Sequence, residues 1–498
     1  CSGKHADCPK NTTQTLPHRV IDVNHSRGSD YVRVCTTSNE MGYYAALSYC
    51  WGGPQAVSLT KRTASKMAEQ IHLRSLPKTL RDAVFVTRQL GLRYLWVDAL
   101  CIIQDSTEDK ATQLALMARI CKDSTVTIAA ASAFSVEEGF LETRQPRPCT
   151  YPSFLLPFRG WKDKRPINRR AWTLQERLLS PRLVNYGTRG LSWQCQTSLR
   201  AHGGMGRFVR DESRRLDSAF FLPDRPALDA ESLHDSWNTI VTDYTGREVS
   251  FADDKLVALA AVASEFQNQG LGNQYLAGIW RTDLCRRLMW YKTRGKSEGL
   301  PQPRSQSYVA PTWSWASVNG SVRLREIWPF GAKANYEILG CTTTLDDESL
   351  ATGKVKDGIL TIRGAVLEAR LWERQKVRNL MGGHLDSESE HHVGNAILDA
   401  DEPRPDGVYM LLMEDGCGMI LAPGKEPSTF RRLGFFDKFR NRKLRRFYDE
   451  KYYSKRRRIG PWLSSSSASV WSVKRRSKDN SRPRARWFQI IHGSFHHI

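Results

Sequence analysis

The sequence predicts an α/β fold in which a mostly parallel sheet is flanked by helices. Three apolar segments lack a polar face, as strands buried on both sides of a sheet do: residues 43–49, 94–105 and 125–131. Helical spacing separates these segments, so strand and helix alternate as in successive β-α-β units. We expect this core to be followed by a helical region and a small β-rich C-terminal subdomain.

The chain has 498 residues, which is more than one hydrophobic core usually holds, so we expect several domains. We divide it into a lead-in (1–30), the main α/β domain (31–200, with its motifs in 43–196), a mainly helical region (201–334), a β-rich subdomain (335–424) and a basic tail (425–498). No apolar segment reaches the roughly 18 residues that span a bilayer, so no membrane partner is expected.

The basic charge is concentrated in the tail. Residues 425–498 carry 21 Lys and Arg against 5 Asp and Glu, whereas the rest of the chain carries 53 against 47. The clusters Lys455–Arg458 and Lys474–Arg476 lie among tryptophans, a pattern that suits nucleic-acid binding or nuclear import. A disordered, solvated tail explains the same composition and is the interpretation we prefer. The main body is expected to be cytoplasmic.

The 11 cysteines are odd in number and include no Cys-x-x-Cys pair. That pattern argues against a disulfide framework and against a Cys-rich zinc site. Cys101, Cys121 and Cys195 lie in apolar surroundings, as buried small hydrophobic residues do in a reducing compartment. The histidines show no metal-ligand spacing either, so the sequence predicts no metal site.

The elements before the central segment follow from local patterns. Three strands are expected, at residues 19–23, 31–35 and 43–49. A turn-forming cluster, Cys50–Pro54, ends the third strand. Pro77 is suited to a first helical position, and apolar residues recur at helical spacing from there to Leu90. Gly91 ends this predicted helix.

The central segment runs from Tyr94 to Asp105 (YLWVDALCIIQD) and is expected to form one strand at the middle of the fold. Asp98 lies inside the apolar run and Gln104 at its end. Open α/β sheets bind ligands at the carboxyl ends of their strands, so we expect one wall of a site here. Because an unpaired buried carboxylate is unfavourable, Asp98 either accepts a structural hydrogen bond from a neighbouring loop or lines the site. Asp105 better suits the capping region of a helix that begins near Ser106.

The remaining elements follow from the same patterns. Strands are expected at 125–131, 182–186, 191–195, 355–371 and 407–413, the second and third as a hairpin. Helices are expected at 171–179, 234–244, 255–267 and 276–291. Residues 310–316 are aromatic and expected to be extended.

Three sequence blocks occur in order: ALSYCWG at 46–52, LWVDALCIIQD at 95–105 and RAWTLQERLLS at 170–180. Together they resemble the fungal heterokaryon incompatibility (HET) domain family. Residues 275–280 and 311–315 resemble the region that follows this domain in many such proteins. Ile103 stands where the family usually has Asn, and Ala171 where Gly is common.

The resemblance implies a role in fungal non-self recognition, in which incompatible fusion triggers cell death. The HET domain is also similar to TIR domains, so the resemblance implies a TIR-like and flavodoxin-like α/β core. Some TIR domains cleave NAD with a helical Glu in the pattern Trp-Cys-x-x-Glu. Trp172 and Glu176 have the same spacing here, so the resemblance implies NAD as a substrate. The alternative is a non-catalytic scaffold that signals by self-association or by binding another protein.

The residues themselves leave two interpretations of the helix that carries Glu176. Trp172 and Glu176 share a helix face, where an aromatic ring and a carboxylate could hold a base or ribose. The carboxylate would then stabilise positive charge that develops on the sugar, which makes both residues catalytic candidates. Alternatively, Glu176 pairs with Arg170 or Arg182 and fixes the helix.

Further ligand-binding candidates lie around the strand ends. Glycine at position 52 could let a ligand approach the backbone, although an ordinary turn with Trp51 in the core explains the same residues. The candidates are Ser48, Tyr49, Gly52, Asp98, Gln104, Asp105 and Arg170.

Overall fold

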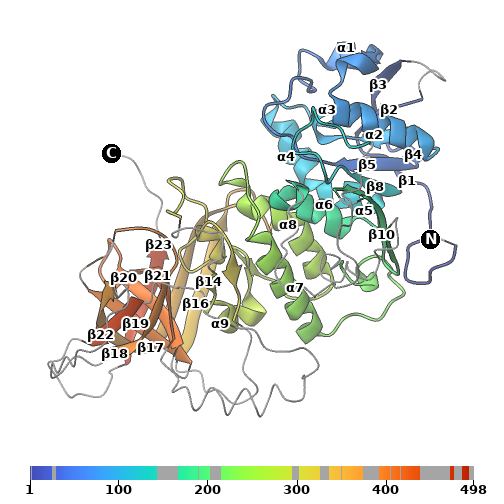
Figure 1. The fold of residues 1–498 in the computed structure, drawn as a ribbon. Coiled ribbons are helices and arrows are strands. Elements are labelled where there is room, and N and C mark those ends of the chain that lie inside the picture. The colour runs from blue at the N-terminus through green and yellow to red at the C-terminus, as the bar shows by residue number, and fades with distance from the viewer. Residues whose placement is uncertain are drawn as a thin grey trace, which may run out of the picture. The chain divides into compact units, whose positions relative to one another are not determined.

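The computed structural model describes residues 1, 3–24, 30–142, 166–188, 190–201, 215–293, 302–325, 336–348, 350–373, 392–403, 405, 407–414, 417–437, 471–475 and 485–492. The chain forms two compact units. Unit 1 comprises residues 1–237, 247–250 and 257–271, and unit 2 comprises 238–246, 251–256 and 272–498. In Figure 1 the strands of unit 1 run from blue to green, and the C-terminal sheet of unit 2 is orange to red.

Unit 1 is built on a mixed sheet. Nine of its described strands are joined in the order β11 (Leu199–Ala201), β10 (Gly190–Cys195), β9 (Arg182–Gly187), β8 (Val126–Ala129), β5 (Tyr44–Ser48), β7 (Tyr94–Trp96), β2 (Arg19–Asp22), β3 (Tyr31–Thr36) and β6 (Ile71–His72). The four middle strands are parallel, because β5 pairs in parallel with β7 and β8, and β8 with β9. The segments 43–49, 94–100 and 125–131, which the sequence predicts to be neighbours, therefore do lie side by side through β5, β7 and β8.

The prediction of a mostly parallel sheet is wrong for the sheet as a whole. The five outer pairings, β11–β10, β10–β9, β7–β2, β2–β3 and β3–β6, are antiparallel. Antiparallel strands need only a short turn between them, as in the hairpin of β9 and β10, whereas parallel strands need a crossover. The α/β class is confirmed, with its parallel part confined to the centre.

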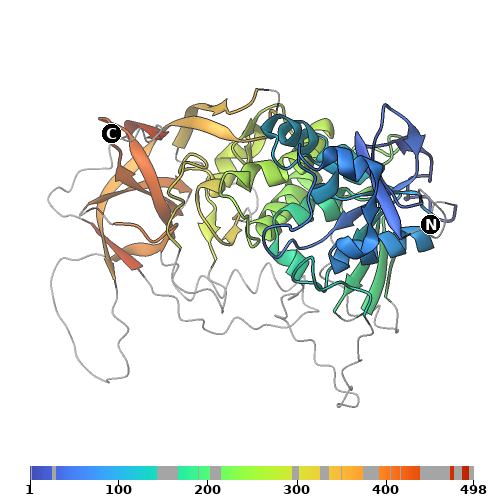
Figure 2. The same cartoon turned by 90° about the horizontal axis from the view of Figure 1, so that it is seen from above.

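Helices cover the parallel centre through three crossovers (Figures 1 and 2). Helix α2 (Lys78–Gln89) leads from β5 to β7, α4 (Thr107–Ala115) and α5 (Met117–Asp123) lead back to β8, and α6 (Trp172–Leu179) leads on to β9. Parallel crossovers are almost always right-handed, and the crossovers to β7 and to β8 run in opposite directions, so the rule puts α2 on one face and α4 and α5 on the other. Helix α6 packs against α5. The four parallel strands alone follow the order β7-β5-β8-β9, as parallel strands of flavodoxin-like sheets do. In such sheets the ligand crevice lies where the order reverses, which here is between β5 and β8.

The central segment is not one strand, which corrects the prediction for Tyr94 to Asp105. Strand β7 ends at Trp96, and a helical turn, α3 (Asp98–Cys101), follows. The backbone amides of Leu100 and Cys101 donate to the carbonyl of Val97, at 3.0 and 2.8 Å. A short, fully buried apolar run fits a strand or a helix equally well, so its composition could not decide. As a result, Asp98 begins a helix at the carboxyl edge of the sheet.

Most other elements lie where they are predicted. Pro77 is the N-cap of α2, and the Ser106 side chain caps α4 by accepting from the amide of Asp109 at 3.3 Å. Helices α7 (Ala230–Tyr244) and α8 (Asp254–Asn268) are confirmed. The remaining small elements of the described chain are α1 (Ala64–Glu69), the strand pair β1 (Gln14–Thr15) and β4 (Met41–Gly42), the pair β14 (Tyr291–Lys292) and β15 (Val322–Arg323), and single 3-10 turns at 73–75, 166–169, 218–220, 281–283 and 315–317.

The helix predicted at 276–291 is wrong. A tight hairpin of β12 (Tyr275–Leu276) and β13 (Ile279–Trp280) occupies its start, and only α9 (Leu284–Arg287) is α-helical. The turn needs positive φ at Ala277 and Gly278, which a helix cannot accommodate. The segment 310–316 is likewise not fully extended, because a 3-10 turn capped by Ser314 begins at Trp315.

Unit 2 contains an antiparallel sheet that runs past the predicted boundary at 424. Its described strands are β16 (Tyr336–Leu345), β17 (Val355–Glu373), β19 (Val408–Glu414), β20 (Cys417–Pro423), β21 (Phe430–Asp437), β18 (His392–Leu398), β22 (Trp471–Arg475) and β23 (Ala485–His492). Strand β21 lies in the segment expected to be a disordered tail. This segment forms a strand because Leu433 and Phe436 pack into the core of the sheet. The cluster Lys455–Arg458 lies outside the described residues. Of the described helices, none combines the length and apolarity needed to cross a membrane.

Candidate functional site

Predicted residues from all three sequence blocks meet at the carboxyl edge of the parallel strands. Ser48 is the last residue of β5, Asp98 directly follows the β7 region, and Glu176 lies in the middle of α6. Arg170 precedes α6 by two positions. Ser48, Asp98 and Arg170 all lie near enough to Glu176 to change its pKa. The fold thus places a carboxyl pair, a hydroxyl and a guanidinium in one neighbourhood.

Asp98 is held by two hydrogen bonds. The Trp51 indole Nε1 donates to Oδ2 at 2.8 Å, and the backbone amide of Ala99 donates to Oδ1 at 2.7 Å. Burial raises the pKa of Asp98, while the Arg170 charge and these hydrogen bonds oppose that rise. Tyr49 is buried beside the carboxylate. The structural bond expected from a neighbouring loop is therefore the one from Trp51, and the same carboxylate also faces the cluster.

Glu176 has a strongly perturbed carboxyl group. Burial raises its pKa to about 7 against the lowering effect of the Ser48 side chain. The negative charge of Asp98 raises the pKa further, and the positive charges of Arg170 and Arg247 lower it. Its Oε2 atom is buried and has no hydrogen-bond partner within the described part of the chain. A carboxyl group in this state can exchange a proton near neutral pH and has a free oxygen to offer.

Arg170 is held by contacts of its side chain and of the backbone at and next to it. Its Nη1 donates to the carbonyl of Tyr49 at 2.7 Å. The amide of Ala171 donates to the carbonyl of Glu248 at 2.9 Å, and the Arg247 Nη1 donates to the carbonyl of Arg170 at 3.2 Å. No sequence pattern pointed to Arg247, because it lies 77 positions from Arg170 and outside any motif. Only the folded chain brings it to the cluster.

The alternative in which Glu176 pairs with Arg182 does not match the contacts. The Arg182 guanidinium donates instead to the carbonyls of Thr125, at 3.3 Å, and Pro9. Trp172 lies one helical turn before Glu176 and is half-buried. The two catalytic candidates therefore share a face of α6, as their spacing predicts.

Two other candidates form hydrogen bonds with the surrounding backbone, and a third, Gly52, packs closely against it. Gln104 donates from Nε2 to the carbonyls of Asp98, at 3.1 Å, and Ile102, at 3.0 Å. Asp105 is exposed and accepts from the amide of Lys61 at 2.9 Å. Gly52 has φ +75°, and a Cβ there would lie 2.3 Å from the Cβ of Ser135. The space that could have admitted a ligand at Gly52 is therefore filled by the protein itself.

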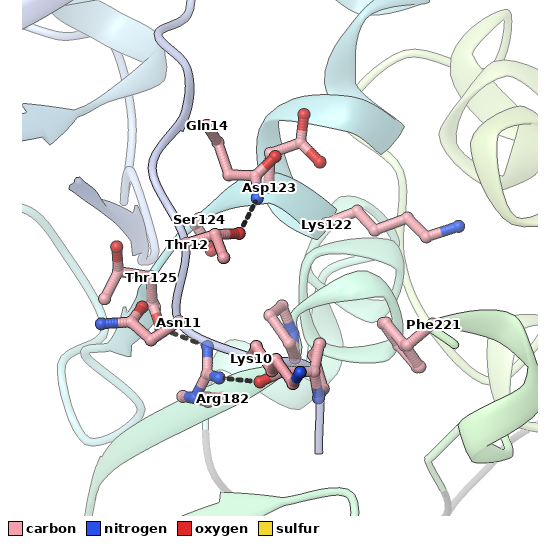
Figure 3. A pocket seen from close by; sticks show the side chains of 12 residues that line it. Lys10, Asn11, Thr12, Gln14, Lys122, Asp123, Ser124, Thr125, Arg182 and Phe221 are labelled. Atoms are coloured by element: carbon pink, nitrogen blue, oxygen red, sulfur yellow. Dashed lines mark hydrogen bonds between the residues drawn. The ribbon is translucent and has the colours of Figure 1, made fainter. Parts of the chain in front are cut away.

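A separate pocket opens at the opposite, amino edge of the parallel strands (Figure 3). Its volume is about 220 Å³. Thr125, just before β8, and Arg182, at the start of β9, place it there. It is lined by Pro9, Lys10, Asn11, Thr12, Gln14, Lys122, Asp123, Ser124, Thr125, Pro181, Arg182 and Phe221. None of the predicted site residues belongs to this pocket.

Comparison with known proteins gives one match. No curated protein and no solved structure matches the chain. Residues 44–176 match the family model described as Heterokaryon incompatibility protein (HET). The match begins with β5 and ends at Glu176, so it contains the parallel strands β5, β7 and β8 and every residue of the cluster except Arg247. Unit 1 of this chain therefore contains a domain of the heterokaryon incompatibility (HET) family.

Proposed function

We propose that the chain acts in heterokaryon incompatibility and that its HET domain is a glycohydrolase that cleaves NAD with Glu176. The match over residues 44–176 supports an incompatibility function in general terms. The glycohydrolase activity is supported chiefly by one observation, the buried Oε2 of Glu176, which has no hydrogen-bond partner among the described residues and lies beside Ser48, Asp98 and Arg170. Death of incompatible cells would follow from loss of NAD.

The proposed reaction needs a carboxylate next to the sugar. As the bond between ribose C1′ and the nicotinamide nitrogen breaks, its electron pair neutralises the pyridinium, and positive charge develops on the sugar. Ionised Glu176 would stabilise that charge through Oε2, the carboxylate oxygen that has no partner in the described part of the chain. A water oxygen then bonds to C1′ and releases a proton. The products are nicotinamide and ADP-ribose.

The surroundings of Glu176 suit the rest of such a substrate. Trp172 lies on the same face of α6 and offers an aromatic surface to a base or ribose. Arg170 and Arg247 bring positive charge to the cluster, which favours a diphosphate. The cluster also lies at the carboxyl ends of the parallel strands, where flavodoxin-like sheets bind nucleotides. The spacing of Trp172 and Glu176 matches that of the TIR enzymes that cleave NAD.

The proposal is tested by measuring NAD loss with the purified full chain. We expect the wild type to release nicotinamide and Glu176→Gln to be slower by about 100-fold or more, as when one stabilising group of a transition state is removed. Glu69→Gln is the matched control, because Glu69 is exposed on α1. We expect this control to keep the wild-type rate.

A folded wild type that leaves NAD intact would overturn the glycohydrolase, as would a fully active Glu176→Gln chain. The HET domain would then be better described as a scaffold that self-associates or binds another protein. In that case, size-exclusion chromatography with light scattering should show oligomers of the wild type. Glu176→Gln would be expected to form the same oligomers.

A further inference from the structure

Near the start of the sequence, residues 3–8 fold back toward Cys1 so that three metal-binding side chains converge. The amide of His5 donates to the carbonyl of Cys1 at 3.0 Å, and the amide of Cys8 donates to the carbonyl of His5 at 3.3 Å. These two successive turns place the side chains of Cys1, His5 and Cys8 in one group. Several ligands from one short segment are typical of structural zinc sites.

The fourth member comes from a distant strand of the same unit. Cys195 is the last residue of β10, and its amide donates to the carbonyl of Ser198 at 2.9 Å, in the turn toward β11. Its Sγ lies 3.4 Å from Nδ1 of His5. The ligand atoms of Cys1, His5, Cys8 and Cys195 all lie within 4.8 Å of one another. Cys8 and Cys195 are buried, and the other two are half-buried.

The distances agree with tetrahedral coordination. A zinc ion with Zn–S bonds of about 2.3 Å and Zn–N bonds of about 2.0–2.1 Å separates the sulfur and nitrogen ligands by about 3.5–3.6 Å. The Nδ1 of His5 lies 3.6 Å from the Sγ of Cys8 and 3.4 Å from the Sγ of Cys195. All three cysteines are free thiols, so no disulfide accounts for their approach.

We propose that Cys1, His5, Cys8 and Cys195 bind one zinc ion as a structural site with three thiolate ligands and one imidazole. Four protein ligands complete a tetrahedron and leave no position for a substrate, which is the arrangement of structural rather than catalytic zinc. The Thr197 hydroxyl lies 3.6 Å from the Sγ of Cys8 and can support that ligand. Three thiolates and Zn²⁺ carry a net charge of about −1, and the guanidinium groups of Arg182 and Arg215 lie near enough to offset it.

The proposed zinc would anchor the start of the chain to the edge of the unit 1 sheet. Pro9 directly follows Cys8, and its carbonyl accepts from Arg182 at the start of β9. The segment from Pro9 to Gln14 then lines one wall of the pocket in Figure 3. Without the metal, this wall would lose its attachment at Cys195. The site is independent of Glu176 and of the proposed glycohydrolase.

Local sequence spacing could not reveal this site. The sequence predicts no metal site because no Cys-x-x-Cys pair occurs. Instead, the spacing is Cys-x₃-His-x₂-Cys at the start, and the last ligand lies 190 positions after His5. Only the pairing of β10 with β9 and β11 fixes Cys195 beside the first eight residues.

The test is metal binding by the full chain, purified under reducing conditions without chelators. We expect elemental analysis to find one zinc per chain in the wild type. Cobalt added in place of zinc should give the intense visible bands of a tetrahedral, thiolate-ligated ion. Cys8→Ser and Cys195→Ser should each weaken zinc binding by about 100-fold or more. Cys285→Ser is the control, because Cys285 is exposed on α9 of unit 2, and it should bind zinc as the wild type does.

A second variant keeps the test decisive if either serine variant fails to fold. His5→Cys replaces the imidazole by a fourth thiolate, so it should keep zinc and shift the cobalt bands toward those of a site with four thiolate ligands. The proposal is overturned if reduced wild-type chain binds neither Zn²⁺ nor Co²⁺, or if both serine variants bind as tightly as wild type. It is also overturned if mass spectrometry of the purified wild type finds a Cys8–Cys195 disulfide in place of the metal.

Discussion

Trp51 and Asp98 are joined by a 2.8 Å hydrogen bond from the indole Nε1 to the carboxylate Oδ2. Trp51 belongs to the first of the three sequence blocks and Asp98 to the second. The third block is attached in the same place, because Arg170 donates to the carbonyl of Tyr49 at 2.7 Å. Direct bonds therefore connect all three blocks at the carboxyl edge of the parallel strands. The three blocks together form one hydrogen-bonded cluster around Glu176.

The bond between Trp51 and Asp98 predicts the effect of Trp51→Phe. Phenylalanine keeps an aromatic ring but has no donor, so the partly buried carboxylate of Asp98 loses the hydrogen bond from Trp51. We expect β5 and β7 to be destabilised by about 1–3 kcal/mol, the usual range for leaving such a group unsatisfied. Hydrogen–deuterium exchange of peptides from these strands in the full chain measures this change. Trp193→Phe, on half-buried β10, is the control, and an equal change in both variants would contradict the prediction.

The raised pKa of Glu176 predicts a stability that depends on pH. Its folded-state pKa of about 7 lies above the ordinary value of 4.5, so the folded chain binds this proton more tightly than the unfolded chain does. Stability from this group is therefore present below pH 4.5 and is lost as the pH rises to about 7. Glu176→Gln removes the titration. We expect the variant to gain about 1–3 kcal/mol relative to wild type on going from pH 5 to pH 8.

Exchange of α6 amides at the two pH values, corrected for the intrinsic rates, measures this gain. Glu69→Gln is again the control and should keep the pH dependence of the wild type. If wild type and Glu176→Gln change equally between pH 5 and pH 8, the carboxyl does not titrate as described. The rate of the proposed glycohydrolase is expected to rise through about pH 7, because the proposed role needs the ionised form of Glu176.

A position can require glycine because of its backbone conformation or because of close packing, and comparing Gly52 with Gly53 distinguishes these two reasons. Both have positive φ, at 75° and 146°, so alanine is strained at either position. At Gly52 a Cβ would also lie 2.6 Å from the Cα of Ser135, whereas at Gly53 nothing lies within 4 Å. We expect Gly52→Ala to be less stable than Gly53→Ala by about 1–3 kcal/mol, as overpacking usually is. Thermal unfolding of the two variants decides this, and equal melting temperatures would contradict it.

The sequence allowed the parallel centre to be predicted because buried strands and helical spacing leave strong local patterns. It also placed Trp172 and Glu176 on one helix face, which the structure confirms. It could not show that β7 ends before Asp98 and that α3 follows, because a buried apolar run such as Val97, Leu100 and Cys101 fits a strand or a helix equally well. Arg247 and Cys195 escaped prediction for another reason. Their contacts depend on which distant segments pair, and no local pattern carries that information.

The most deeply buried ion pair described in unit 2 supports a last prediction. The side chains of Arg432 and Asp399 are fully buried, with 2.9 Å between Nε and Oδ2. Arg432 also donates to the carbonyl of Leu288 at 2.5 Å, and its Cζ lies 3.6 Å from the centre of the Trp290 ring. The pair thus holds β21 to the segment that follows α9.

Arg432→Met would leave the Asp399 carboxylate buried without its main partner. Removing one member of such a pair usually destabilises a protein by about 3–5 kcal/mol, and we expect that range here. Arg431→Met is the matched control. Arg431 is the sequence neighbour of Arg432 and pairs with Glu402 in a more exposed position, so this ion pair should contribute about 0–1 kcal/mol to stability. Exchange of β20 and β21 amides in the full chain measures both. Adding Asp399→Asn to Arg432→Met removes the stranded charge, so the double variant should recover part of the loss; if it is no more stable than Arg432→Met, the loss comes from packing around Trp290 instead.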